Sequence, residues 1–340
     1  MLFKKKETKS SNRINEEDIF IQSYGNKISK ELDVFYNPLM KLNRDISLLV
    51  IATYFDKPIK FCDPMIASGI RELRFLKTIP DKFEKITCGD ISEKSILETV
   101  KNFKANKISI KNLDLLQNNA INTITKGYFD FIEIDPFGSP VPFLDIAVQR
   151  IKHNGILSVT ATDTAALCGT YPKTSYRKYG IQIEMTHCYE ELGLRNLIAY
   201  CIRQGAKYEK TLTPILAYSQ DHYYKIFFKV EDSRDKSLKQ LKELFVKIKK
   251  QKCFKNTLGK TYTKYYCDKK FIKELKENLD LIKDNKKVSK LLHSLSEEVE
   301  NIGHINIHKL QKEYKLDCKI KFEELITDLK TKKYEASRPH

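Results

Sequence analysis

The sequence lacks long apolar runs, paired cysteines and an export signal. No stretch approaches membrane-spanning length, and the polar first residues do not resemble a signal peptide. The eight cysteines never form a C-x-x-C pair, which argues against a zinc ribbon or a redox motif. We therefore expect a cytoplasmic protein with reduced cysteines, no metal site and no membrane partner.

Two common phosphate-binding loops are also absent. The chain contains neither a G-x-G-x-x-G nor a G-x-x-x-x-G-K-[ST] pattern. Their absence weakens the case for a dinucleotide or a nucleoside triphosphate as the ligand.

The charge balance is strongly basic. The 340 residues include 61 Lys and Arg and 44 Asp and Glu, which gives a net charge of +17. Such an excess suggests a polyanionic partner, most simply nucleic acid, although a lysine-rich proteome produces the same bias. The length suggests about two domains.

Strand and helix patterns alternate through the first two thirds of the chain. Short apolar runs indicate strands at residues 57–62, 85–88, 108–111, 130–134 and 156–162, with helical patterns between them. Two β-rich runs at 212–218 and 223–230 read as an antiparallel hairpin that closes the sheet. Residues 1–30 read as a mobile or loosely packed arm, and lysine-rich helices follow residue 231.

An acid follows each of the first four predicted strands: Asp63, Asp90, Asp114 and Asp135. In a doubly wound sheet the carboxyl ends of the strands meet at one crevice, and an acid after the second strand binds ribose hydroxyls. Loops favour Asp in any case, so chance could also produce the series. A nucleoside-bearing cofactor without a pyrophosphate fits best, and we expect S-adenosylmethionine.

These patterns predict an α/β fold, a Rossmann-like class I methyltransferase with a seven-stranded sheet. The predicted organisation is an arm over residues 1–30, a methyltransferase domain over 31–230, and a smaller, mainly helical α+β C-terminal domain over 231–340.

The most informative stretch is residues 131–140, Phe-Ile-Glu-Ile-Asp-Pro-Phe-Gly-Ser-Pro. It begins as a buried strand and stops at Asp135, where Pro136 stiffens the loop. A carboxylate beside an aromatic ring can accept hydrogen bonds from an exocyclic amine and stack on a base. A capping Asp in an ordinary turn is the alternative interpretation.

Residues 162–179 read as a long polar loop of the kind that often covers a substrate. Tyr176, Arg177, Lys178 and Tyr179 interleave aromatic and basic side chains there, as surfaces that bind nucleic acid do.

With these motifs, the chain resembles the tRNA (guanine-N2)-dimethyltransferases that modify position 26, in their shorter archaeal form. The stretches that carry the resemblance are residues 34–38, 43–45, 63–75, 90–92, 114–115, 134–140, 160–163 and 221–223. The resemblance implies that the cofactor, S-adenosylmethionine, is bound by Arg44, Asp63, Arg71, Asp90, Asp114 and Leu115. It implies Asp135 as the catalytic acid, with Phe35, Pro136 and Phe137 at the guanine.

The resemblance further implies tRNA as the partner, and we expect a monomer without a protein partner. Two alternatives stay open from the residues alone. One is an exocyclic-amine methyltransferase that acts on another RNA or on DNA, and the other is a non-enzymatic RNA-binding relative.

Overall fold

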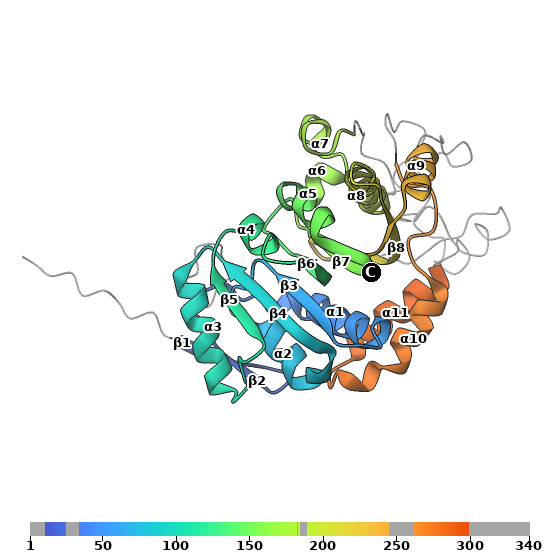
Figure 1. Ribbon diagram of the computed structural model, residues 1–340. Coiled ribbons are helices and arrows are strands. Elements are labelled where there is room, and N and C mark those ends of the chain that lie inside the picture. The colour runs from blue at the N-terminus through green and yellow to red at the C-terminus, as the bar shows by residue number, and fades with distance from the viewer. Residues whose placement is uncertain (1–10, 25–33, 182, 184–188, 245–260, 299–340) are drawn as a thin grey trace, which may run out of the picture. The chain divides into compact units, whose positions relative to one another are not determined.

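A computed structural model of the chain describes residues 11–24, 34–181, 183, 189–244 and 261–298 (Figure 1). The described residues fall into two compact units. The first runs to Ile134 and also contains residues 274–291, and the second comprises Asp135 to Lys273 and the residues from Leu292 onward.

Seven strands form one mixed sheet in the order β5-β4-β3-β6-β7-β9-β8. Their bounds are β3 Ile59–Asp63, β4 Phe83–Asp90, β5 Leu113–Gln117, β6 Phe129–Ile134, β7 Ile151–Ala161, β8 Lys210–Gln220 and β9 Tyr223–Asp232. The predicted α/β fold with a seven-stranded sheet is therefore confirmed.

The first four strands of this order belong to the first unit, and all of them run parallel. β3 pairs with β4 and β6, and β4 pairs with β5. Phe61, Phe131 and Ile132 are fully buried, as expected for parallel strands covered on both faces. The carboxyl ends of β3, β4, β5 and β6 therefore lie along one edge of the sheet.

Helices and short 3-10 turns complete the first unit. They are η1 Pro38–Met40, α1 Lys41–Tyr54, α2 Ile70–Thr78, η2 Pro80–Lys82, α3 Glu93–Ala105, α4 Ala120–Ile124 and η4 Leu279–Leu281. Ser92 caps α3 by accepting from Ser95 N at 3.3 Å, as serine commonly does at a helix start.

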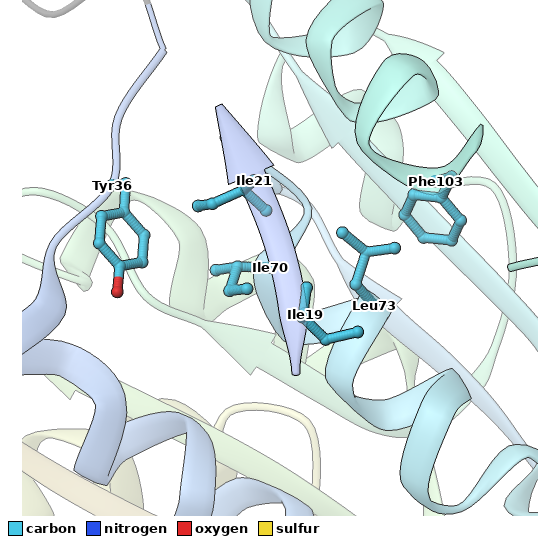
Figure 2. Close-up of a cluster of buried hydrophobic side chains, with 6 residues drawn as sticks. All are labelled: Ile19, Ile21, Tyr36, Ile70, Leu73 and Phe103. Carbon is cyan, nitrogen blue, oxygen red and sulfur yellow. The ribbon is translucent and has the colours of Figure 1, made fainter. Parts of the chain in front are cut away.

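The N-terminal stretch contains a docked hairpin. β1 Ser11–Glu16 and β2 Ile19–Tyr24 pair antiparallel. Ile19 and Ile21 pack with Tyr36, Ile70, Leu73 and Phe103 in a buried cluster against α2 and α3 (Figure 2). The prediction of a loosely packed arm is thus wrong for residues 11–24. The short sequence pattern I-F-I has too few apolar residues to reveal this docking.

Asn106 ties the hairpin to the end of α3. Its side chain accepts from Phe20 N at 2.8 Å and donates to Phe20 O at 2.6 Å. One amide thus satisfies both backbone groups of an outer-strand residue, which would otherwise be left for water.

A segment from the far end of the chain also belongs to the first unit. Asn278 Nδ2 donates to Thr53 Oγ1 at 3.0 Å, and Lys283 N donates to Glu17 Oε2 at 2.9 Å. Lys41 Nζ donates to Asp284 O at 3.4 Å. Residues 274–291 therefore contact both α1 and the turn of the hairpin.

The second unit is built on β7, β9 and β8, which pair antiparallel in that order. Its helices are α5 Val141–Arg150, α6 Thr164–Leu167, α7 Pro172–Tyr179, α8 Tyr189–Ala206 and α9 Arg234–Glu243. The predicted hairpin of residues 212–230 is confirmed as β8 and β9. Two further helices, α10 Lys269–Glu277 and α11 Lys286–Glu298, contribute residues to both units.

Two local predictions are wrong. The third strand is β5, not residues 108–111, because Lys107 turns the chain with a positive φ after α3 has ended at Ala105, and Ile108 packs against the hairpin cluster. The predicted loop 162–179 contains α6 and α7. Among the described residues, no helix is both long and apolar enough to cross a membrane.

Candidate functional site

At the end of β4, Asp90 fixes two loops. Its Oδ2 accepts from Ala67 N at 3.0 Å and its Oδ1 accepts from Ser92 N at 2.9 Å. Ile66 N also donates to Gly89 O at 2.9 Å. Gly69 has φ +72°, which lets the chain turn sharply into α2. Asp90 thus lies where the sequence placed it, half-buried, and each oxygen retains a lone pair.

A buried charge cluster lies behind this loop. Arg71 donates to Asn43 Oδ1 at 3.1 Å and pairs with Glu133 at 3.2 Å and Asp63 at 3.4 Å. Burial raises the pKa of Asp63 to about 6, although the Arg71 guanidinium opposes the rise. Burial, and then the Asp63 carboxyl, hold the pKa of Glu72 well above its usual range. Both carboxyls therefore hold a proton more tightly than exposed acids do.

A second buried network surrounds Arg44. Arg44 Nε donates to Glu16 Oε1 at 2.8 Å and its second amine pairs with the other oxygen of Glu16. Arg74 pairs with both Glu16, at 3.0 Å, and Asp45, at 2.5 Å. Burial would raise the pKa of Glu16, but Arg44 and Arg74 outweigh it and lower that pKa to about 2. Glu16 is thus the acid that pairs with Arg44.

Asp114 is not at a strand end, contrary to the sequence prediction. It lies in the second position of β5, half-exposed, and pairs with the equally exposed Lys85 at 2.6 Å. Leu115 follows it inside the strand. The carboxyl end of β5 instead carries Asn118, whose N donates to Asp90 O at 2.9 Å. The cofactor role of Asp114 and Leu115 thus stays a prediction without support from their positions.

In the second unit, the loop of residues 135–140 follows β6 directly. Thr162 fixes it by two hydrogen bonds: Gly138 N donates to Thr162 Oγ1 at 2.7 Å, and Thr162 N donates to Gly138 O at 2.9 Å. Pro136 is buried, Asp135 is half-buried and Phe137 is 51% exposed. The loop therefore presents an acid and a ring from a fixed backbone.

A buried relay holds the same loop from α7. Tyr179 donates its hydroxyl hydrogen to Asp163 Oδ1 at 2.7 Å and therefore accepts from Ser139 Oγ at 2.8 Å. Burial and the Asp163 carboxylate raise the pKa of Tyr179, so the hydroxyl stays protonated. Lys178 Nζ balances Asp163 at 3.0 Å.

Phe35, the other predicted base contact, belongs to the first unit and is half-buried, next to Tyr36. Phe35 and Phe137 belong to different units, so their joint contact with a base stays a prediction.

Several residues of these networks were missed in the sequence. Glu16 lay in the predicted arm, and Tyr179 was read as a surface aromatic. Glu133 had a visible signal, because it is an acid inside an apolar strand, and the structure buries it fully. Such an acid needs a buried cation, which Arg71 supplies.

The edge formed by β3 and β4 fits S-adenosylmethionine. Asp90 offers acceptors for a ribose diol, as acids after the second strand of such sheets do. The loop of residues 63–69 brings the chain back beside Asp90 through the bond from Ala67 N, so a nucleoside there meets backbone as well as carboxylate. No metal-binding group of three or more His, Cys, Asp or Glu occurs within the described ranges.

The chain matches known proteins over most of its length. Residues 10–340 match the family described as N2,N2-dimethylguanosine tRNA methyltransferase. A tRNA (guanine(26)-N(2)/guanine(27)-N(2))-dimethyltransferase of Aquifex aeolicus is 33% identical over 88% of this chain and 83% of its own. A tRNA (guanine(26)-N(2))-dimethyltransferase of Pyrococcus furiosus is 34% identical over 90% of this chain and 87% of its own.

The structure is similar to that of Trm1 from Pyrococcus horikoshii, solved as a complex with S-adenosyl-L-methionine. The TM-score is 0.82 at 29% identity, over 97% of this chain and 94% of the other. With the sheet, the loop after β6 and these matches in agreement, the chain belongs to the N2,N2-dimethylguanosine tRNA methyltransferase family.

Proposed function

We propose that this chain is an S-adenosylmethionine-dependent tRNA methyltransferase that acts on the exocyclic N2 of guanine at position 26, producing N2-methyl- and N2,N2-dimethylguanosine. The observation that carries the proposal is the loop of residues 135–140. It follows β6 directly, hydrogen bonds fix it at Gly138 and Ser139, and it leaves Phe137 half-exposed. An acid and a ring on one rigid loop suit a flat base with an exocyclic amine.

The first unit provides the cofactor side of the proposal. When bound, S-adenosylmethionine supplies an electrophilic methyl group on a sulfonium. Asp90 accepts hydrogen bonds from the ribose hydroxyls, and Asp63 and Arg71 shape the loop beside it. Arg44 and Arg71 are proposed as further contacts, although both are already paired with acids of this chain. Asp114 and Leu115 remain the weakest part of the assignment.

Asp135 performs the acid–base step. Guanine N2 is a poor nucleophile because its lone pair is delocalised into the ring. The Asp135 carboxylate accepts hydrogen bonds from the N2 hydrogens, which orients the amine and favours the localised lone pair. As N2 gains a methyl group, Asp135 takes the proton that N2 loses. Pro136 and Phe137 hold the ring plane, with Phe35 proposed on the other side.

The remaining assignments complete the proposal. The chain acts in the cytoplasm as a monomer without a protein partner. Residues 31–230 form the methyltransferase domain, and residues 231–340 form a domain that supplies phosphate contacts to tRNA. Much of this second domain lies outside the described residues.

Methyl transfer into unmodified tRNA tests the proposal. Labelled S-adenosylmethionine is incubated with the protein and tRNA, and the digested nucleosides are identified by mass spectrometry. We expect N2,N2-dimethylguanosine that disappears when guanine 26 is replaced. Because the Aquifex aeolicus relative is named for positions 26 and 27, a tRNA altered only at position 27 is the matched control.

Asp135→Asn tests the assigned acid. We expect methyl transfer to fall by about a thousandfold or more, while binding of S-adenosylmethionine by calorimetry stays unchanged. Unchanged transfer by Asp135→Asn would overturn the catalytic assignment. A methylated adenosine, or transfer only into DNA, would overturn the proposed substrate.

A further inference from the structure

Helix α7 has a buried side that holds the loop of residues 135–140. Ser175 is fully buried, and Tyr179 completes the relay from Asp163 to Ser139. Both ends of this relay are short hydrogen bonds, at 2.7 and 2.8 Å. Any group on the outside of α7 is therefore held at a fixed distance from the loop.

The outer side of α7 is basic and aromatic. Lys173, Tyr176 and Arg177 are all exposed, and their spacings of three and four residues make them neighbours on one helix face. Tyr176 is 65% exposed, and Tyr171, which precedes the helix, is 60% exposed. Within the described ranges neither Lys173 nor Arg177 makes an ion pair.

The chemistry of this face favours single-stranded nucleic acid over protein. The helix sequence P-K-T-S-Y-R-K-Y has three cations and no acid. Among the residues that the structure describes, only Lys178 of these cations has a carboxylate partner, Asp163. Exposed tyrosines provide flat surfaces on which unpaired bases stack, and the neighbouring cations suit phosphates. The net charge of +17 likewise favours a negatively charged partner.

The position of this face relates it to the target base. Phe137 is two residues from Ser139, and Ser139 contacts Tyr179 on the inner side of α7. A helix with its side chains is about 10–12 Å across, so the outer face lies about one helix diameter from the loop. Nucleotides that lie near a base held at Phe137 can reach this face.

We propose that α7 is an RNA-binding element of the same site: Tyr171 and Tyr176 stack on unpaired tRNA bases that lie near the target guanine, and Lys173 and Arg177 contact phosphates. This proposal rests on the proposed function, because it takes the loop of residues 135–140 as the place where the base is held.

The double substitution Lys173→Ala with Tyr176→Ala tests the outer face. Its matched control is Lys126→Ala with Tyr128→Ala, which removes the same two residue types. Lys126 and Tyr128 are also exposed, but they lie before β6, at the opposite end of that strand from Asp135. The dissociation constant for unmodified tRNA is measured by fluorescence anisotropy at several salt concentrations, and that for S-adenosylmethionine by calorimetry.

We expect the α7 variant to bind tRNA about tenfold or more weakly. The slope of log affinity against log salt concentration should decrease in magnitude by about one, which corresponds to one lost phosphate contact. The control variant should stay within about twofold of the unsubstituted protein, and both variants should bind S-adenosylmethionine normally. An α7 variant that binds tRNA as the control does would overturn the inference.

Methyl transfer by the unsubstituted protein separates the two proposals. If the unsubstituted protein methylates guanine 26 but the α7 variant binds tRNA normally, the role of α7 is rejected and the proposed function stands. If the unsubstituted protein neither binds nor methylates tRNA, the proposed function fails, and the inference fails with it.

Discussion

At the scale of single residues, the hydroxyl of Tyr179 joins Asp163 to the loop that carries Asp135. We expect Tyr179→Phe to lower kcat for methyl transfer by about tenfold to a hundredfold, because the loop loses the hydrogen bond between Ser139 and Tyr179. The KM for S-adenosylmethionine should not change. Steady-state kinetics with each substrate varied separately would measure both values.

Tyr208→Phe is the matched control for this prediction. Tyr208 also donates its hydroxyl hydrogen to an acid, Asp145, but that bond is exposed and its acceptor lies on α5, outside the loop of residues 135–140. We expect the kcat of Tyr208→Phe to stay within about twofold of that of the unsubstituted protein. Equal losses in the two variants would show that a missing tyrosine hydroxyl has no specific effect on the loop.

Glu16 gives the clearest pH dependence. Its pKa is about 2 in the folded protein against an ordinary value of 4.5, so its stabilisation is complete above about pH 4.5 and is lost as the pH falls toward 2. That shift corresponds to about 3 kcal/mol. We expect Glu16→Gln to lower the free energy of unfolding by about 3 kcal/mol at pH 7, and by less at pH 3.

Urea unfolding at pH 7, 5 and 3 would measure this difference. Glu84→Gln serves as the control, because Glu84 pairs with Lys60 on the surface at 3.3 Å and both side chains are about half-exposed. If the free energy of unfolding lost in Glu16→Gln is as large at pH 3 as at pH 7, the assigned ion pairs are contradicted.

Residue chemistry could be predicted from the sequence only where a motif marked it. Asp90, Pro136 and Phe137 lie as expected because short turns follow their strands at once. Asp114 does not, because strand boundaries in a weakly apolar stretch shift by a few residues without changing the sequence pattern. Glu16 could not be found, since its partners Arg44 and Arg74 are 28 and 58 residues away along the chain.

At the scale of elements, the contact between β4 and α4 depends on a glycine. A Cβ at Gly89 would collide with the side chain of Thr123, on α4. We expect Gly89→Ala to destabilise the fold by about 1–3 kcal/mol through overpacking. Thermal or urea unfolding would measure the loss.

The colliding atoms all belong to Thr123, so the double variant Gly89→Ala with Thr123→Ala provides the internal test. Gly89→Ala should lower the free energy of unfolding much less in the Thr123→Ala background than in the unsubstituted protein. Strictly additive losses would place the strain elsewhere in β4.

Elements with strong local signals were predicted well, such as the helices α2 and α3 between predicted strands and the hairpin of β8 and β9. The hairpin of β1 and β2 was not, because its stability comes from contacts with α2 and α3 and from Asn106. Helix α7 was read as loop because P-K-T-S-Y-R-K-Y lacks an apolar stripe, and its buried side is held by Ser175 and Tyr179.

At the scale of the whole molecule, the net charge of +17 predicts how tRNA binding responds to salt. If the protein contacts six to ten phosphates, the affinity should fall by about 10³–10⁵ between 50 and 200 mM salt. Anisotropy titrations across this range would measure the slope. An affinity that is insensitive to salt would contradict a phosphate-binding C-terminal domain.

The contribution of residues 274–291 to the first unit has a consequence for the order in which the chain folds during synthesis. The ribosome releases Ile134 well before residue 274, a delay of 140 residues (274 minus 134). At about 5–20 residues per second this delay lasts about 7–30 s. Through that interval the nascent first unit lacks the bond from Asn278 to Thr53 and the cover of Glu17 by Lys283. Chaperones that bind nascent chains would therefore find α1 and the β1–β2 turn uncovered until residues 278–283 have been synthesised.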